Sequence, residues 1–446
     1  YGIGGGVSAA YGYDAFGRFA SVTSAFHAVT NVFTYGYLQG TDLINCMTNS
    51  AGIMRQRAHE QNRGLVTAVS NRVNQTLISA FDYESDALGR RARRVDRTAA
   101  LLATNDFAYN ARGEITGAGM GGDSYGYGYD SIGNRVWSAE NAATNLYAAN
   151  ALNQYTNVTG GAAVSPAYDP DGNLTGCTLP DGVWRFFWDA ENRLAAAERL
   201  TFDAADFRIR VRNVYDHRSR RVAKQLQRRY YREDGGMLLD EIRWGFPAAS
   251  ARRVWDGWNI VAETAADAVA GTTNAACYTW GLDLSGTMQG AGGVGGLLAE
   301  TKVSSTSTNT FFACCDANGN VTEYVDGTGT VRGRYGYSPF GEIASQSGDM
   351  ADAFTHRFST KPFDAETGLA MYQLRPYSPP LGRWLTRDPI EELGGLNLHA
   401  ISGNDLVNRI DKFGMITVKS PTGRCGCYSV NTIKALFESA ASNPIV

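Results

Sequence analysis

The sequence predicts an all-β protein built from short repeated hairpins. Gly (51 residues) and Tyr (23 residues) are abundant, and only 19% of the residues are charged. A short motif containing an aromatic residue, Asp and Gly also recurs along most of the chain. This composition suits many short strands and turns better than long helices. At 446 residues, the chain is long enough for one continuous repeat architecture with a large buried surface.

The repeated motif is an aromatic residue, Asp, two variable residues, Gly, a polar residue and usually an apolar one. Its clearest copies are residues 13–19, 129–135 and 168–174, with degraded copies at 109–115, 188–194, 315–321 and 337–343. Asp at the first position and Gly at the fourth favour a type I β-turn. Because the flanking residues are aromatic-rich and partly alternating, each copy predicts a β-hairpin.

One hairpin cannot bury its own apolar face, so neighbouring repeats must stack. We expect the repeats to grow from about residue 8 to residue 370 into a long curling sheet. Residues 264–276 and 302–310 are rich in Ala, Thr, Ser and Asn, and they predict long surface loops. Residues 290–295 match a dinucleotide-binding glycine pattern but lack its βαβ context, which favours a tight loop before a strand at 297–300.

Charge and cysteine usage exclude several classes of function. A net charge of −3 and a pI near 6.0 argue against nucleic-acid binding by the shell. The basic runs at 90–94 and 218–221 are expected to be solvated faces. Seven scattered cysteines do not form a disulfide framework, and the pair Cys425 and Cys427 lacks a second pair for zinc. We therefore expect no cofactor and no metal site.

The most distinctive stretch is the C-terminal block from Arg375 to Met415, which contains Asp388 and Asp411. Two close aspartates cannot both ionise cheaply, so one can activate water while the other donates a proton to an amide. Arg375, in a Pro-rich approach to Asp388, can set their charge state or steady an oxyanion. The alternative is structural, because aspartates in turns commonly accept backbone hydrogen bonds.

The repeats, together with the C-terminal block, resemble the Rhs/YD-repeat family with its Rhs-associated core domain. The block motifs that carry the resemblance are residues 337–342, 362–369, 375–377, 381–384, 387–389 and 395–398. The resemblance implies a hollow β-shell that encloses a C-terminal polymorphic toxin. In this family the core domain plugs the shell and cuts the chain as an intramolecular aspartic protease.

By the same resemblance, Arg375, Asp388 and Asp411 are the catalytic residues, and the cut falls between Met415 and Ile416. The implied domains are a YD-repeat shell at 1–334, the core domain at 335–415 and the start of a variable toxin region at 416–446. The sequence departs from the family pattern with Glu391 in place of Gly, Lys412 in place of Pro and Met415 in place of Leu.

The function implied is an encapsulating toxin shell that releases its C-terminal segment in a single-turnover self-cleavage, in competition between bacteria. The implied partners are its own toxin segment, a shell-closing or secretion-system partner and an immunity protein, and the implied location is secreted or cell-surface exposed. The competing hypothesis is a non-enzymatic YD-repeat surface protein that binds carbohydrate or adhesion partners through its aromatic-rich strands.

Overall fold

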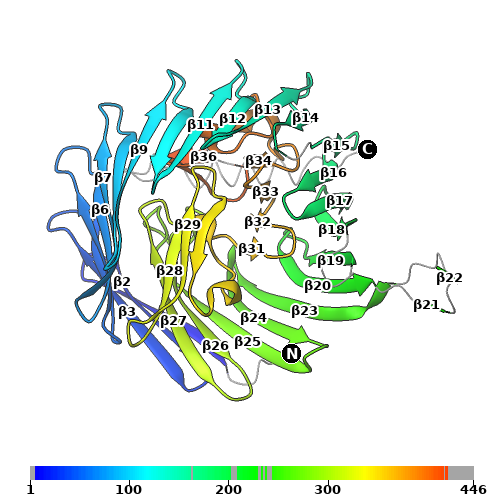
Figure 1. Ribbon diagram of the computed structural model, residues 1–446. Coiled ribbons are helices and arrows are strands. Elements are labelled where there is room, and N and C mark those ends of the chain that lie inside the picture. The colour runs from blue at the N-terminus through cyan, green and yellow to red at the C-terminus, as the bar shows by residue number, and fades with distance from the viewer. Residues whose placement is uncertain are drawn as a thin grey trace.

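The molecule is built from two antiparallel sheets of 14 strands each, and the all-β prediction is confirmed (Figure 1). The computed structural model describes residues 6–161, 164–201, 208–229, 233–234, 237–238, 244–415 and 417–419. Within each sheet every strand pairs with its neighbours in sequence, except that β20 pairs with β23. Among the described residues the helices are short 3-10 turns, and none is long and apolar enough to cross a membrane.

The first sheet contains β1 (Val7–Tyr13), β2 (Phe19–Phe26), β3 (Val29–Tyr37), β4 (Ile44–Asn49), β5 (Ile53–His59), β6 (Val66–Val73), β7 (Thr76–Ser85), β8 (Arg91–Arg97), β9 (Leu102–Tyr109), β10 (Ile115–Met120), β11 (Asp123–Tyr129), β12 (Arg135–Glu140), β13 (Ala143–Ala149) and β14 (Tyr155–Thr159). The second contains β15 (Ala167–Tyr168), β16 (Leu174–Leu179), β17 (Gly182–Trp188), β18 (Leu194–Arg199), β19 (Arg208–Tyr215), β20 (Arg221–Arg229), β23 (Trp244–Asp256), β24 (Asn259–Asp267), β25 (Thr272–Trp280), β26 (Leu297–Val303), β27 (Thr308–Cys315), β28 (Val321–Asp326), β29 (Val331–Tyr337) and β30 (Ile343–Ser347).

The smaller elements are β21 (Glu233–Asp234), β22 (Met237–Leu238), β31 (Phe363–Asp364), β32 (Leu369–Met371), β33 (Pro376–Ser378), β34 (Arg383–Trp384), β35 (Arg409–Asp411) and β36 (Thr417–Lys419), with 3-10 helices η1 (Ala351–Ala353), η2 (Phe358–Thr360), η3 (Glu391–Gly394) and η4 (Ser402–Asn404).

The repeat motif forms the turn that the sequence predicts. At the copy 129–135, the Gly133 N–H donates to the Asp130 carbonyl oxygen at 3.3 Å, which closes the turn between β11 and β12. Asp130 Oδ1 also accepts the backbone N–H groups of Ile132 and Asn134 at 3.0 and 2.8 Å. Gly133 has a φ of 87°, in the left-handed region that favours glycine. The Asp and the Gly therefore act locally, within their own hairpin.

The aromatic position and the polar position of the motif connect neighbouring hairpins. The Tyr129 hydroxyl donates to the Ile115 carbonyl oxygen at 2.8 Å, one hairpin back. Asn134 Nδ2 bonds both Asp130 Oδ2 and, one hairpin forward, Asn153 Oδ1, each at 2.9 Å. The backward bond recurs from Tyr37 to Phe19, Tyr109 to Arg91, Trp188 to Leu174, Tyr215 to Leu194 and Tyr337 to Val321. These hydrogen bonds therefore connect successive repeats along one edge of the sheets.

The end of the second sheet packs on the start of the first, so that the wall has two layers there (Figure 1). Ser24 and Thr279 share a hydroxyl hydrogen bond of 2.7 Å between the layers. Arg55 Nη2 donates to the Ala313 carbonyl oxygen at 2.7 Å. The curling sheet is therefore confirmed in form, but it is divided into two sheets between β14 and β15.

The two predicted surface loops are wrong. Residues 264–276 lie mostly in β24 and β25, and residues 302–310 mostly in β26 and β27. Small polar side chains allow close cross-strand pairing here, as in the 2.9 Å contact between the Thr301 and Thr310 hydroxyls. The strand predicted at 297–300 is confirmed as the start of β26.

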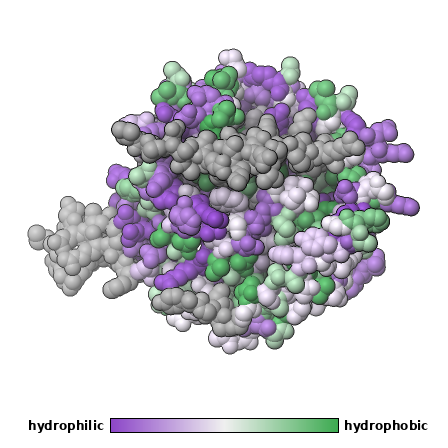
Figure 2. Space-filling model, turned by 180° about the vertical axis from the view of Figure 1, so that it is seen from behind, coloured by the Kyte–Doolittle hydropathy of each residue, from purple (hydrophilic) through white to green (hydrophobic). Residues whose placement is uncertain are grey.

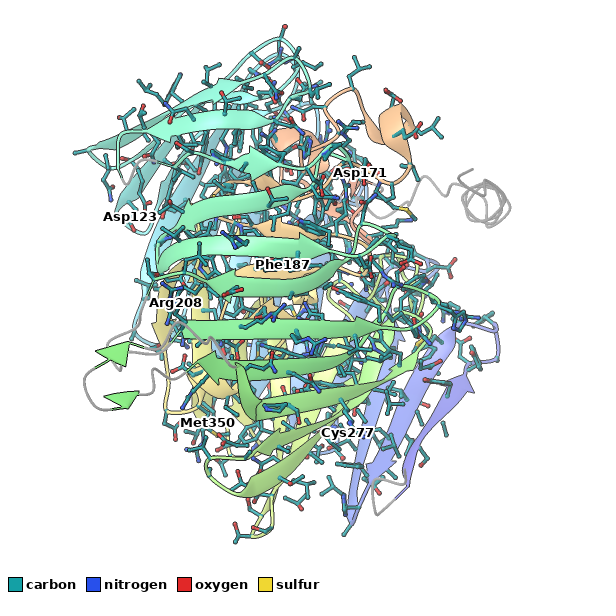
Figure 3. The ribbon with its side chains drawn as sticks, turned by 90° about the vertical axis from the view of Figure 1, so that its right-hand side faces the viewer. Asp123, Asp171, Phe187, Arg208, Cys277 and Met350 are labelled. Atoms are coloured by element: carbon teal, nitrogen blue, oxygen red, sulfur yellow. The ribbon has the colours of Figure 1, made fainter. Side chains whose placement is uncertain are left out.

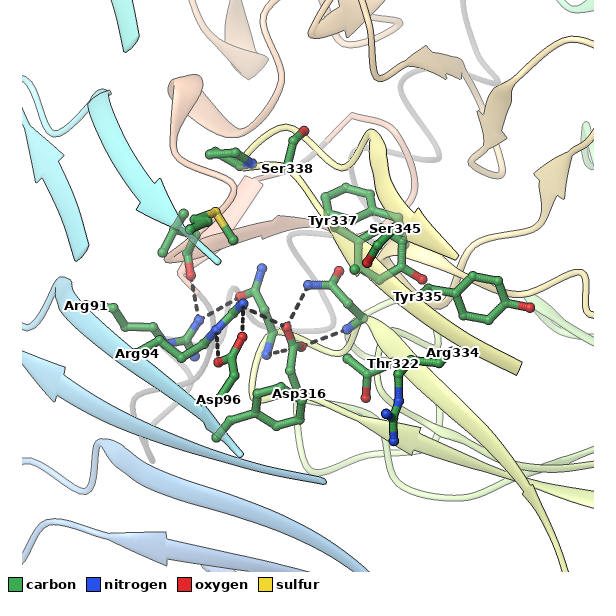
Figure 4. A pocket seen from close by; sticks show the side chains of 18 of the residues that line it. Arg91, Arg94, Asp96, Asp316, Thr322, Arg334, Tyr335, Tyr337, Ser338 and Ser345 are labelled. Atoms are coloured by element: carbon green, nitrogen blue, oxygen red, sulfur yellow. Dashed lines mark hydrogen bonds and ion pairs between the residues drawn. The ribbon is translucent and has the colours of Figure 1, made fainter. Parts of the chain in front are cut away.

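The basic runs are only partly solvated, because alternation along a strand turns every second side chain inward. Arg91 and Arg221 are 8% and 6% exposed. Arg91 and Arg94 line a cavity of about 150 Å³ together with Asp316 of the loop between β27 and β28, and Arg94 Nη1 lies 3.7 Å from Asp316 Oδ2 (Figure 4). The outward faces are mixed: Phe187 and Arg208 lie on the face in Figure 3, and hydrophilic and hydrophobic residues are interspersed in Figure 2.

Residues 351–415, here called the inner segment, form the short strands and turns that lie inside the curve of the sheets (Figure 1). Tyr377 and Trp384, both almost completely buried, pack with Ile115 and Tyr127 of the first sheet. Leu369 and other residues of this segment pack on the second sheet. The segment is thereby held between both walls, and it carries all the predicted site residues up to Met415.

Candidate active site

The structure brings Arg375, Asp388 and Asp411 together. Arg375 directly precedes β33, Asp388 follows β34 and Asp411 ends β35. Arg375 Nη2 lies 2.7 Å from Asp388 Oδ2 and 4.0 Å from Asp411 Oδ2. All three side chains are buried. One guanidinium nitrogen therefore lies between the two carboxylates that the sequence singled out.

Arg375 also holds the chain that leads to the predicted cut. Its Nε donates a short hydrogen bond to the Gly414 carbonyl oxygen, and its Nη1 donates to the Leu398 carbonyl oxygen at 3.0 Å. The guanidinium carbon lies 4.4 Å from the centre of the Trp384 ring, a cation–π contact that favours the charged side chain. Burial lowers the pKa of Arg375, while both aspartates oppose that shift.

Asp388 is the carboxyl group that can hold a proton near neutral pH. Burial raises its pKa to about 6; Arg375 opposes the rise and Asp411 adds to it. Its Oδ1 accepts the Ile390 N–H at 3.1 Å. Gly394 packs against its other oxygen, where an added Cβ would lie 2.5 Å from Oδ2. The carboxyl group is thus closely confined on both sides.

Asp411 organises the turn that ends at Met415. Its Oδ1 accepts three backbone N–H groups, from Phe413 at 3.1 Å, Gly414 at 2.7 Å and Met415 at 3.0 Å. The peptide between Gly414 and Met415 is therefore held at both ends, its carbonyl by Arg375 and its N–H by Asp411. Ile416, the other half of the predicted cut, lies outside the described residues, as do residues 420–446.

Sequence reasoning missed Lys361, which supports the same turn. Lys361 is buried, and its Nζ donates to the carbonyl oxygens of Lys412 at 2.8 Å and Gly292 at 2.7 Å. Gln373 Oε1 is a third acceptor at 3.1 Å. Nothing in the local sequence marks Lys361, because its acceptors come from segments 51 and 69 residues away.

The glycine run at 290–295 is a structural loop, as the sequence favoured. The Asp283 carboxylate accepts the N–H groups of Ala291 and Gly293 at 2.7 and 3.1 Å, so an internal anion occupies the donors that a phosphate would need. Gly292 lies against the turn, and a Cβ there would clash with the Lys412 carbonyl oxygen. The glycine run does allow a close approach of backbone to backbone, but the segment that approaches it is the Asp411 turn.

The fold and the repeat-forming turns define the class of the protein as a YD-repeat shell. A family model described as Teneurin YD-shell matches residues 296–406. The chain is 39% identical over 94 residues to toxin subunit YenC2 of Yersinia entomophaga and 28% identical over 258 residues to double-stranded DNA deaminase toxin A of Burkholderia cenocepacia. It is also 36% identical over 98 residues to salivary gland surface protein 1 of Aedes aegypti.

These matches cover 20%, 56% and 22% of this chain, and 10%, 16% and 3% of the respective relatives, so the chain spans a small part of each. Among solved structures, TcdB2-TccC3 aligns with 92% of this chain and 21% of its own length, with a TM-score of 0.66 and 16% identity. The TcdB2-TccC3-Cdc42 structure covers 98% of the chain with a TM-score of 0.64. The chain thus has the fold of a YD-repeat shell, and over the matched segments it is similar to toxin subunits of this kind.

Proposed function

We propose that this chain is part of an encapsulating toxin shell that releases its C-terminal segment by intramolecular aspartic-type autoproteolysis after Met415. The observation that carries the proposal is the position of Arg375. One side chain contacts Asp388, lies near Asp411 and holds the carbonyl of Gly414, immediately before the predicted cut. A purely structural turn aspartate would need no second buried carboxylate beside it.

The proposed reaction is hydrolysis of the Met415–Ile416 peptide bond. Asp411 takes a proton from water, and the water oxygen attacks the Met415 carbonyl carbon. Arg375 stabilises the negative charge that develops. Protonated Asp388 gives its proton to the Ile416 nitrogen as the carbon–nitrogen bond breaks, which leaves an amine at Ile416 and a carboxylic acid at Met415. The Met415 carboxyl group then gives its proton to the ionised Asp388 and becomes a carboxylate. Asp388 is assigned the acid role because its pKa of about 6 keeps part of the population protonated near neutral pH.

Because the substrate is the next segment of the same chain, its effective concentration is very high. A site that turns over once is therefore sufficient. In this proposal residues 1–334 belong to the shell, residues 335–415 to the core domain and residues 416–446 to the start of a toxin region. The proposed partners are an immunity protein and a shell-closing or secretion partner. The proposed location is secreted, in toxin delivery between bacteria, which the toxin relatives support.

The second candidate is a non-enzymatic surface protein that binds carbohydrate or adhesion partners. It is favoured by the similarity to salivary gland surface protein 1, which covers 22% of this chain. The two candidates make opposite predictions for the integrity of the chain, because the second requires no cut after Met415.

Mass spectrometry of the purified full-length protein tests the proposal. We expect an N-terminal product ending at Met415 and a second product beginning at Ile416, both lost in Asp388→Asn. Asp405→Asn is the control, because Asp405 is equally buried in the same segment but bonds Asn408 rather than Arg375. A wild-type chain that stays whole after prolonged incubation would contradict autoproteolysis and favour the surface protein.

A further inference from the structure

Lys361 ties the site to the shell wall. It follows η2 in the inner segment, while Gly292 belongs to the loop between β25 and β26 of the second sheet. Its ammonium donates to carbonyl oxygens in two places, Gly292 in the wall and Lys412 in the Asp411 turn. A second contact locks the same turn, since the Leu374 N–H donates to the Phe413 carbonyl oxygen at 2.9 Å.

The groups that face Lys361 are mostly acceptors and acids. Asp411 and Asp283 both favour its charged form, and the Tyr372 ring centre lies 5.1 Å from Nζ. Asp283 is itself completely buried beneath the glycine loop. His356, which is also buried, is held neutral around pH 7, since burial lowers its pKa to about 3. The cation at Nζ therefore lies near two buried acids and holds together two backbone segments.

We propose that Lys361 is a positioning residue for the cut after Met415: its charged ammonium holds the Asp411 turn against Arg375 only when the β25–β26 loop is docked. The inference rests on the proposed self-cleavage. It adds a condition to it, because a chain whose second sheet has not closed over the inner segment lacks the Gly292 acceptor. Cleavage would then follow completion of the shell, and the toxin segment would stay covalently attached until the wall is in place.

This role predicts a specific pH dependence. Burial lowers the pKa of Lys361 to about 7, with Asp411 and Asp283 opposing the shift. As pH rises through 7, Lys361 loses its charge, and its hold on the two carbonyl oxygens weakens. Asp388 loses its proton over a lower range, around pH 6. The cut rate should therefore fall with the loss of two protons as pH rises from 6 to 8.

Two substitutions in the full-length protein test the contact between Lys361 and the β25–β26 loop, one at each partner. Lys361→Met removes the charge, and Gly292→Ala pushes the loop away from the Lys412 carbonyl. Each should slow the cut by about 100-fold, because a displacement of about 1 Å at a reacting centre costs that much. In Lys361→Met the residual rate should also fall with loss of one proton only, a change that general destabilisation would not produce.

The controls match each variant. Lys224→Met removes another largely buried lysine, which pairs with Asp364 and Glu366 away from the turn. Gly271→Ala places a Cβ at a glycine with a similar φ, 65° against 63° at Gly292, but in open space. Both controls should cut within about threefold of wild type, as expected where the reacting geometry is kept. Wild-type rates in both test variants, with the two-proton profile intact in Lys361→Met, would overturn the proposal.

A second measurement separates this inference from the proposed cleavage. Asp388→Asn keeps the chain whole, so hydrogen exchange at the amides of Phe413, Gly414 and Met415 can be followed with and without Lys361→Met. We expect these three amides, which donate to Asp411, to lose protection when Lys361 is replaced. Unchanged protection would refute the positioning role of Lys361. If the wild-type chain never cuts but protection still depends on Lys361, the proposed function fails and the contact of Lys361 with the turn remains.

Discussion

Glu391 has a backbone conformation that suits glycine. Its φ is 54°, in the left-handed region, at the position where the family resemblance predicts Gly. A side chain there costs about 1 to 2 kcal/mol relative to an ordinary conformation. The residue lies three positions after Asp388, and its N–H donates to the Asp388 carbonyl oxygen at 3.0 Å. The departure therefore strains the turn that carries one of the two site aspartates.

Glu391→Gly should stabilise the protein. The gain in the free energy of unfolding is about 0.5 to 1 kcal/mol, because the relief of strain exceeds the added entropy of Gly in the unfolded chain. Glu392→Gly is the control: Glu392 has the same chemistry but no positive φ, so Gly there should destabilise by up to about 1 kcal/mol. Thermal unfolding of both variants in the Asp388→Asn background gives the comparison. Equal losses in the two would show that the strain is not released.

At the level of single elements, an aromatic residue at the turn of six hairpins bonds the hairpin before it. The Tyr129 hydroxyl reaches Ile115 across the turn of the preceding hairpin, and five other copies make the same backward bond. The stacking of repeats therefore depends on directed polar bonds along one rim as well as on buried apolar faces. This explains why an aromatic residue with a donor group, Tyr or Trp, stands at these positions.

Tyr129→Phe should loosen β10 and β11 locally. Loss of one hydrogen bond to the Ile115 carbonyl costs about 1 kcal/mol, so amides of residues 115–129 should exchange about fivefold faster. Tyr13→Phe is the matched control, because Tyr13 fills the same motif position, is 65% exposed and shows no hydroxyl bond to the described residues. Hydrogen exchange with mass spectrometry checks both. An equal change in amide exchange in the two variants would argue against a role of the Tyr129 hydrogen bond in joining neighbouring hairpins.

The repeat explains how far the sequence can predict this structure. Its turns, hairpins and strand order follow from interactions within about 20 residues, and these predictions are confirmed. The loops predicted at 264–276 and 302–310 are wrong because Ala and Thr suit pairing on a β-sheet as well as loops. The resemblance named Arg375, Asp388 and Asp411, which the structure brings together, and their catalytic role stays a prediction. Lys361 and Gly292 were not predicted, because their contacts depend on how the second sheet folds back over the inner segment.

The inner segment is joined to the wall of the molecule by a buried ion-pair cluster. Asp364 of β31 accepts Arg221 Nη1 at 2.6 Å and Lys224 Nζ at 3.1 Å, both from β20 of the second sheet. Burial alone would raise the pKa of Asp364, but Lys224 and Arg221 outweigh it and lower the pKa well below the usual value. Because the folded pKa is depressed, the pairing stabilises the protein above about pH 4 and is lost as pH falls further.

Asp364→Asn should therefore separate the inner segment from the wall more than any surface change. Buried Arg221 would lose its carboxylate partner and Lys224 would keep only Glu366, at a cost of about 3 to 5 kcal/mol. The control Asp349→Asn removes an ion pair with Arg332 whose aspartate is 61% exposed, so its cost should stay below about 1 kcal/mol. Thermal unfolding and limited proteolysis of residues 351–415, both at pH 7, distinguish these outcomes.

A second expectation ties this cluster to the site at the scale of the whole molecule. The Asp364 contact lies on β20, while Lys361, three residues earlier, contacts the β25–β26 loop, so the inner segment is anchored at two separate places on the second sheet. We expect Asp364→Asn to destabilise the protein while the cut after Met415 keeps its wild-type rate, because the Lys361 anchor, and not the β20 contacts, holds the Asp411 turn. A slowed cut in Asp364→Asn, with lost protection of the Phe413–Met415 amides, would show instead that both anchors position the turn.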